Sequence, residues 1–126
     1  MNTKSVLVVE DDFVMGMEMR EFLESLDLKV LGIIDTGEEA VNKSKKLSPE
    51  LIFMDIRLKG KMNGIEAAGL VREFTETPII FLTGYKDNTT RDSACKIKHS
   101  YFVSKPFNPD DLIKIIESIC NGTLSY

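Results

Sequence analysis

The stretch Val6-Leu7-Val8-Val9-Glu10-Asp11-Asp12 decides the fold, because an unbroken apolar run ends abruptly in three acids. A run that does not alternate apolar and polar residues is typical of a strand buried on both faces. Four further runs of this kind start near Val30, Leu51, Ile79 and Tyr101. The spacing between successive starts leaves room for a helix in every gap, whereas hairpins need far fewer residues. The sequence therefore predicts an α/β domain with a parallel sheet.

Between these runs, apolar side chains recur at helical spacing. Three apolar helix faces are predicted, consisting of Met15, Met19, Phe22, Leu23 and Leu26; of Ala67, Leu70, Val71 and Phe74; and of Leu112, Ile115, Ile116 and Ile119. Asn63-Gly64 precedes the second helix and Thr77-Pro78 marks its end, while Asn108 caps the third helix and Gly122 stops it. Residues 87–97 contain poor helix formers, so we expect a weakly held helix there. Residues 1–126 form one domain of five strands and five helices.

The charge balance narrows the possible partners. Sixteen Lys and Arg residues against twenty Asp and Glu residues give a formal net charge of −4. The field of such a chain repels phosphate backbones and acidic membranes, so we expect no direct nucleic-acid or membrane partner. The apolar runs are too short to span a bilayer and no secretory signal precedes the first strand, which predicts a cytoplasmic location. Two distant cysteines and one histidine indicate neither a disulfide framework nor a zinc site.

Chemically useful side chains follow four of the predicted strands. These strand ends are Glu10-Asp11-Asp12, Met54-Asp55, Leu82-Thr83-Gly84 and Ser104-Lys105-Pro106. Each alone has an ordinary explanation, such as Asp12 capping the helix after it. Because ligands of open parallel sheets bind beyond the carboxyl ends of the strands, the four ends should converge on one rim. Carboxylates placed together repel one another unless a cation joins them, and hard oxygen ligands suit Mg²⁺. A carboxylate beside Mg²⁺ can act as a nucleophile toward a phosphoryl group.

The sequence strongly resembles the receiver domain of two-component response regulators over nearly its whole length. The motifs that carry the resemblance are Val8-Val9-Glu10-Asp11, Met54-Asp55-Ile56-Arg57, Asn63-Gly64-Ile65-Glu66, Pro78-Ile79-Ile80-Phe81-Leu82-Thr83 and Lys105-Pro106-Phe107. The resemblance implies a doubly wound, flavodoxin-like fold with a five-stranded parallel sheet of strand order 2-1-3-4-5 and helices on both faces. It also implies a signalling domain that catalyses only its own phosphorylation and dephosphorylation.

The resemblance assigns roles residue by residue. Asp55 is the implied phosphoacceptor, Asp11 a direct Mg²⁺ ligand, Glu10 an acid that reaches the metal through water, and Arg57 a ligand through its backbone carbonyl. Glu10 stands where many members of the family have Asp. Thr83 would bond a phosphoryl oxygen.

Further expectations concern the phosphoryl group, its donor and the response to phosphorylation. Lys105 would pair with the phosphoryl group, and Thr83 and Phe102 would form the switch. The implied phosphodonor is a sensor histidine kinase or a phosphotransfer protein. The implied output is a downstream protein or a homodimer, bound through the surface of the fourth helix, fifth strand and fifth helix.

Other functions remain open alternatives. A phosphatase with an aspartate nucleophile would carry a second acid where this chain has Arg57. A flavodoxin-like electron carrier would have a Gly-, Ser- and Thr-rich loop in place of Glu10-Asp11-Asp12. A degenerate receiver acting as a constitutive scaffold would lack Asp55 or its partners. His99 as a phosphocarrier has no helical-bundle setting, and Lys43, Lys45 and Lys46 are interpreted as a solvated helix face.

Overall fold

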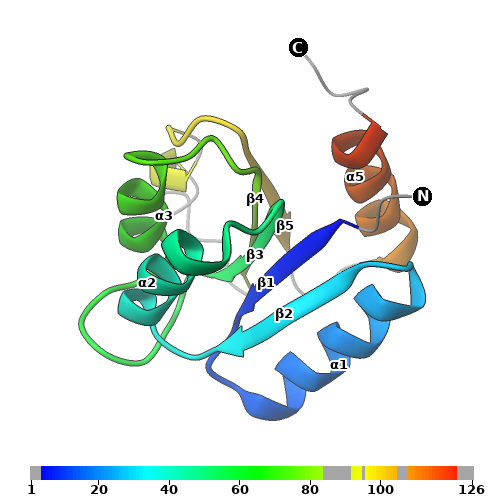
Figure 1. Ribbon diagram of the computed structural model, residues 1–126, viewed down its shortest axis with the longest axis horizontal. Helices are drawn as coiled ribbons and strands as arrows, with labels where there is room; N and C mark the ends of the chain where they lie inside the picture. Colours follow the sequence, from blue (N-terminus) through cyan, green and yellow to red (C-terminus); the bar gives the residue numbers. More distant parts are fainter. Residues whose placement is uncertain (1–3, 84–91, 95, 105–107, 122–126) are drawn as a thin grey trace.

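In the computed structural model of the protein, a single parallel sheet lies between two layers of helices (Figure 1). The structure describes residues 4–83, 92–94, 96–104 and 108–121. The strand order is β2-β1-β3-β4-β5, as the sequence predicts. The strands are β1 (Ser5–Val9), β2 (Lys29–Ile34), β3 (Leu51–Asp55), β4 (Ile79–Thr83) and β5 (Ser100–Ser104), and the helices are α1 (Phe13–Ser25), α2 (Gly37–Leu47), α3 (Gly64–Arg72) and α5 (Pro109–Asn121).

Both faces of the sheet are buried, which is why the strand runs show no alternation in the sequence. On one face, Val6 and Val8 of β1 pack in a cluster with side chains of α1 and α5. On the other face, Leu7 and Val9 pack in a cluster with side chains of α2 and α3. All four strand residues are at most 1% exposed. Full burial of such an aliphatic side chain contributes about 1.5–3 kcal/mol, so the two clusters account for much of the stability.

Helix starts are fixed by side-chain caps. The carboxylate of Asp12 accepts a hydrogen bond from the Met15 backbone N–H at 3.1 Å, at the start of α1. At α3, the side chain of Asn63 accepts from the Glu66 N–H, and the Glu66 carboxylate accepts in return from the Asn63 N–H. Such reciprocal capping satisfies two donors that the helix itself leaves free. At α5, the side chain of Asn108 accepts from the Asp110 N–H, which agrees with the predicted cap.

Two of the predicted helix faces need correction. Met15 is 39% exposed rather than buried, because the first turn of α1 projects beyond the strands while Met19 and Leu23 pack on the sheet. On the predicted face that begins at Ala67, Leu70 and Phe74 are 38% and 39% exposed rather than buried. The small Ala67 and Ala68 let α3 approach the sheet closely and share its buried face with Val71, and α3 ends at Arg72, before Phe74.

The predicted fourth helix falls mostly outside the described residues. Residues 92–94 are helical, and Ala94 is 1% exposed and belongs to the same cluster as α2 and α3. No helix within the described part of the chain is long and apolar enough to cross a membrane.

The order of the strands creates the position for a site. The chain leaves β1 toward β2 on one side and then returns to place β3 on the other side of β1. At such a switch point the connections after the two central strands diverge, leaving a crevice at their carboxyl ends. Val9 pairs with Met54, so the residues that follow, Glu10 and Asp55, emerge side by side.

Candidate functional site

Three acids meet at the carboxyl ends of β1 and β3. Glu10, Asp11 and Asp55 each offer a carboxylate oxygen, and these atoms all lie within 4.8 Å of one another. The pairing of β1 with β3 explains the proximity, because it brings the ends of both strands to the same level. The structure therefore brings together the three acids that the sequence predicts as a metal-binding group.

Glu10 is held in place by both its backbone and its side chain. It is only 7% exposed. Its N–H donates to the carbonyl of Ile34 at 2.8 Å, which ties it to the end of β2. Its Oε2 accepts a hydrogen bond from the Asp12 N–H at 3.1 Å, which closes the turn into α1. One oxygen of Glu10 is thus engaged by the protein, and the carboxylate is fixed rather than free to swing into solvent.

The electrostatics of Asp11 reflect the crowding of negative charge. Burial raises the pKa of the Asp11 carboxyl above its ordinary value, and a hydrogen bond to Glu10 and the charge of Glu10 raise it further. Lys59 acts in the opposite direction and lowers this pKa. A divalent cation would stabilise the ionised form of Asp11, because it offsets the repulsion between this carboxylate and its acidic neighbour.

Asp55 is buried almost as deeply as Glu10 in this group of acids. It ends β3, is 9% exposed, and its Oδ1 accepts a hydrogen bond from the Arg57 N–H at 3.2 Å. The Arg57 side chain is exposed. The role predicted for the Arg57 backbone carbonyl stays a prediction.

A close backbone contact sets the position of Asp55. The Gly64 N–H donates to the Ile56 carbonyl at 2.8 Å, which anchors the first turn of α3 on the segment after β3. A Cβ atom on Gly64 would lie 2.2 Å from the carbonyl oxygen of Asp55, far inside van der Waals contact. Only glycine fits there. Sequence reasoning used Asn63-Gly64 as a helix start and missed this contact.

The remaining predicted site residues are described only in part. The backbone of Thr83 ends β4 and pairs with Ser104, but its side chain lies outside the described part of the structure. Lys105 also lies outside the described residues. Phe102, on β5, is partly buried and lines a cavity of about 190 Å³ together with Ala94, Ile97 and others. The full set of lining residues is Phe81, Ala94, Ile97, Ser100, Tyr101 and Phe102.

Two other residues considered in the sequence, Asp12 and His99, lie outside the three-acid group. Asp12 serves as a helix cap and is not part of the three-acid group. His99 lies just before β5, at the amino ends of the strands, whereas the three acids lie at the carboxyl ends. The Nε2 of His99 lies 3.1 Å from the Glu76 carboxylate. It makes no approach to Asp55.

The donor set fits magnesium. Mg²⁺ prefers hard oxygen ligands, usually one or two carboxylates completed by water and by phosphate oxygens of a substrate. Glu10, Asp11 and Asp55 provide such carboxylate oxygens at the carboxyl ends of β1 and β3. Chemically, the group can bind a divalent cation and present a carboxylate nucleophile beside it.

Comparisons with known proteins agree with this geometry. The family model for the response regulator receiver domain matches residues 6–117. The chain is 32% identical to the response regulator protein GraR of Staphylococcus saprophyticus over 90% of its own length and 50% of that protein. It spans about half the length of the curated relatives it matches.

Two solved structures extend the likeness to three dimensions. One is the signal receiver domain of a modulated diguanylate cyclase from Desulfovibrio desulfuricans, with 35% identity, a TM-score of 0.86, and coverage of 99% of this chain and 100% of that one. The other is the chemotaxis protein CheY4 of Vibrio cholerae, with 25% identity, a TM-score of 0.80, and coverage of 94% and 99%.

Proposed function

The chain belongs to the response regulator receiver domain family, the signalling domain of two-component systems, and from this premise we propose that Asp55 is its phosphoacceptor. The observation that carries the proposal is that the Glu10, Asp11 and Asp55 carboxylates lie within 4.8 Å of one another at the carboxyl ends of β1 and β3. Residues 1–126 act as a single receiver domain. Its proposed location is the cytoplasm.

The proposed reaction transfers a phosphoryl group from a histidine of a sensor kinase or phosphotransfer protein. A carboxylate oxygen of Asp55 attacks the phosphorus while the bond from phosphorus to the donor's ring nitrogen breaks, and that nitrogen keeps the electron pair. Asp55 becomes an acyl phosphate. The hydrogen bond from the Arg57 N–H orients the carboxylate before the attack.

Magnesium is the proposed cofactor. Asp11 and Asp55 would hold it directly, Glu10 would reach it through water, and the Arg57 carbonyl would be a further ligand. When bound, Mg²⁺ neutralises charge on the transferring phosphoryl oxygens. Thr83, at the end of β4, is proposed to donate a hydrogen bond from its hydroxyl to those oxygens. Lys105, which follows β5 in the sequence, is proposed to contact them as a cation.

The output is a change in partner binding through Phe102. Its location beside a cavity of about 190 Å³ supports this role, because a ring at such a place has room for a second arrangement. A rearrangement there would reshape the surface of the fourth helix, β5 and α5. A downstream protein or a second copy of the chain binds that surface.

Exposed apolar side chains beside the acids support docking of the phosphodonor. Phe13 and Val14, which open α1, are 70% and 64% exposed. They follow Asp11 and Asp12 directly, so a protein that reaches Asp55 would cover them. Isolated exposed apolar residues are ordinary, but large adjacent ones at the rim of a reaction site favour a protein interface.

The test uses a small acyl phosphate with Mg²⁺ and intact-protein mass spectrometry. Wild type should gain one phosphoryl group, and Asp55→Asn should gain none. Asp11→Ala should lose most of the modification because it removes a metal ligand, whereas Asp12→Asn, which keeps the helix cap and lies outside the acid group, should label like wild type. Mg²⁺-dependent labelling of Asp55→Asn at wild-type stoichiometry would exclude Asp55 as the phosphoacceptor.

A further inference from the structure

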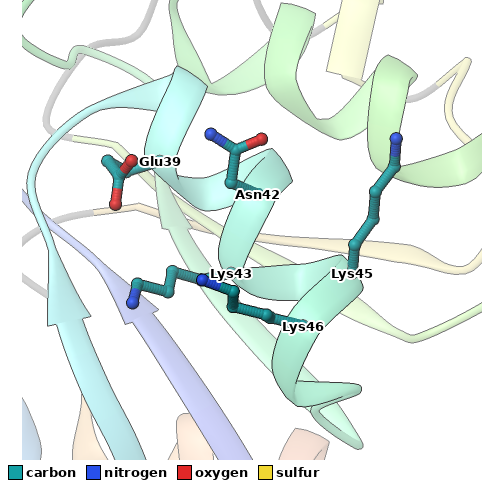
Figure 2. A pocket seen from close by; sticks show the side chains of 5 residues that line it. All are labelled: Glu39, Asn42, Lys43, Lys45 and Lys46. Carbon is teal, nitrogen blue, oxygen red and sulfur yellow. The ribbon is translucent and has the colours of Figure 1, made fainter.

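The C-terminal half of α2 carries positive charge that the phosphorylation site does not use. Lys43, Lys45 and Lys46 line a hollow of about 560 Å³ over this helix, with Glu39 and Asn42 nearer its start (Figure 2). Within the described part of the chain, none of the three lysines forms an ion pair. The chain as a whole has a formal net charge of −4, so this local excess of cations has the opposite sign to the rest of the molecule.

Apolar surface lies next to one of these charges, Lys45, whereas Lys43 and Lys46 extend from the side of α2 that faces away from α3 (Figure 2). Figure 2 shows Lys45 extending toward α3, and its Nζ lies 5.2 Å from the centroid of the Phe74 ring. The ring is nevertheless 39% exposed, and Leu70, one helical turn earlier, is 38% exposed. Elsewhere among the described residues, exposed large apolar side chains occur only in the first half of α1 and at Leu47, the last residue of α2. A surface that combines such side chains with cations is suited to a protein partner.

We propose that Lys43, Lys45, Lys46, Leu70 and Phe74, here named the α2–α3 patch, dock an acidic peptide segment of a partner protein. Acidic residues of that segment face the three lysines, and its apolar residues cover Leu70 and Phe74. Complementary charge steers the encounter and fixes its register, while the buried apolar anchors slow dissociation.

A peptide suits this patch better than a polyanionic surface. A nucleic acid or an acidic membrane presents negative charge over an area larger than the patch, so the acids elsewhere in the chain would be repelled. A short segment carries its acids only where the lysines are. It also supplies the apolar residues that Leu70 and Phe74 require, which a phosphate backbone does not.

The α2–α3 patch is distant from the phosphoacceptor by topology. Each helix here runs antiparallel to the strands it connects, so the C-terminal ends of α2 and α3 lie near the amino ends of the strands. Asp55 lies at the carboxyl ends. The proposed docking therefore occurs with or without phosphorylation, and it goes beyond the function proposed above.

Binding of a defined probe to the full chain tests this proposal. The probe is a fluorescein-labelled peptide of about 15 residues in which Leu recurs at helical spacing and the other positions are mostly Glu. Fluorescence anisotropy measures its affinity for wild type and for two patch variants, Lys43→Glu/Lys46→Glu and Phe74→Ser. Each patch variant should weaken binding roughly tenfold or more.

Matched controls separate the patch from general effects. Lys98→Glu/Lys114→Glu makes the same charge change at two other exposed lysines, one in the turn before β5 and one on α5, and Met17→Ser removes an exposed apolar side chain from α1. Both should change the affinity by less than about twofold. Asp55→Asn should bind the probe like wild type, so a failure of the phosphoacceptor assignment would leave this result intact. Thermal melting of every variant confirms that it is folded.

Several results would overturn the proposal. The first such result is that wild type does not bind the probe at a peptide concentration of about 1 mM, which would mean that even weak affinity is absent. The control double variant could weaken binding as much as Lys43→Glu/Lys46→Glu does. Sedimentation velocity could show a wild-type dimer that the patch variants abolish, which would make this face a self-association surface. Tighter binding of single-stranded DNA or of phosphatidylserine vesicles through the same residues would assign it to a polyanion instead.

Discussion

At the scale of single residues, the position of the proposed nucleophile, Asp55, depends on a residue without a side chain. Gly64 lets the first turn of α3 rest on the backbone of Asp55 and Ile56, and the helix is anchored there by one hydrogen bond. The carboxylate of Asp55 then projects toward Glu10 and Asp11. A displacement of this backbone would move the carboxylate of Asp55 relative to Glu10 and Asp11, and small misplacements of a reacting group reduce its rate of reaction.

The first prediction is that Gly64→Ala destabilises the protein and slows phosphorylation. Its Cβ would lie 2.2 Å from the Asp55 carbonyl oxygen, so backbone must move, and we expect a loss of about 1–3 kcal/mol in the free energy of unfolding. Gly69→Ala is the control in the same helix, because no atom lies within 4 Å of its Cβ position. The control should gain about 0.5–1 kcal/mol. Urea denaturation and labelling by acyl phosphate measure both effects, and equal behaviour of the two variants would contradict the role of Gly64.

The second prediction concerns the pH dependence of stability at Asp11. Its pKa is raised in the folded state above its ordinary value of 3.8, so the folded protein holds this proton to higher pH than the unfolded chain. Stability from this group is therefore fully present below that ordinary value and is lost as the pH rises through the folded pKa. Without divalent cations, Asp11→Asn should melt at a higher temperature than wild type at neutral pH.

That advantage of Asp11→Asn should fade as the pH falls below about 4, and added Mg²⁺ should reverse it by stabilising only wild type. Melting curves in EDTA and in MgCl₂ across this pH range measure both effects. A variant that is less stable than wild type in EDTA at neutral pH would mean that Asp11 carries no electrostatic penalty.

At the scale of elements, the strands could be predicted from sequence far better than the exposed sides of the helices. β1 and β3 are buried on both faces, so their apolar runs are unbroken and unambiguous. Helix faces are less certain, because periodicity shows which residues share a side but not how far the helix extends beyond the sheet. Met15 and Leu70 match the period and still face solvent.

In the candidate site, too, some features could be predicted from the sequence and others could not. The grouping of Glu10, Asp11 and Asp55 could be predicted, because the sequence shows that acidic residues directly follow the apolar runs of two strands. The approach of Gly64 to Asp55 could not, since it depends on how α3 meets β3 in three dimensions. The exposure of Phe13 likewise depends on where the first turn of α1 lies relative to the sheet.

The third prediction concerns α1 as a docking element. Phe13→Ser/Val14→Ser should slow transfer from a phosphorylated sensor kinase roughly tenfold or more, because it removes about 1.5–3 kcal/mol of burial per side chain from the complex. Labelling by a small acyl phosphate should be unchanged, and stability should change by less than about 0.5 kcal/mol, since both side chains are exposed.

Leu47→Ser, which removes an exposed apolar side chain from α2, is the control for this experiment. Phosphotransfer is measured with a kinase that phosphorylates wild type. If the α1 double variant lost labelling by kinase and acyl phosphate to the same degree, the defect would lie in the site itself and not in docking.

At the scale of the whole molecule, the acids and the proposed switch are connected through the sheet. β3 lies beside β4, and β4 lies beside β5 with Thr83 paired to Ser104. A movement of the β4 end toward a phosphorylated Asp55 would act on β5 through this pairing. Phe102 is two residues from Ser104, beside its cavity. The α2–α3 patch, in contrast, lies near the other ends of the strands.

The last prediction is that phosphorylation changes amide hydrogen exchange along β5 and leaves α2 unaltered. Coupling between two sites typically amounts to about 1–3 kcal/mol, enough to change exchange rates in β5 several-fold or more. Peptides that cover residues 100–104 should therefore differ between the phosphorylated and unphosphorylated protein, while those from residues 37–47 should not. Asp55→Asn under identical treatment is the control and should show neither change. Differences confined to residues 37–47 would contradict the route through β5, and they would also couple the α2–α3 patch to phosphorylation, which its distance from Asp55 argues against.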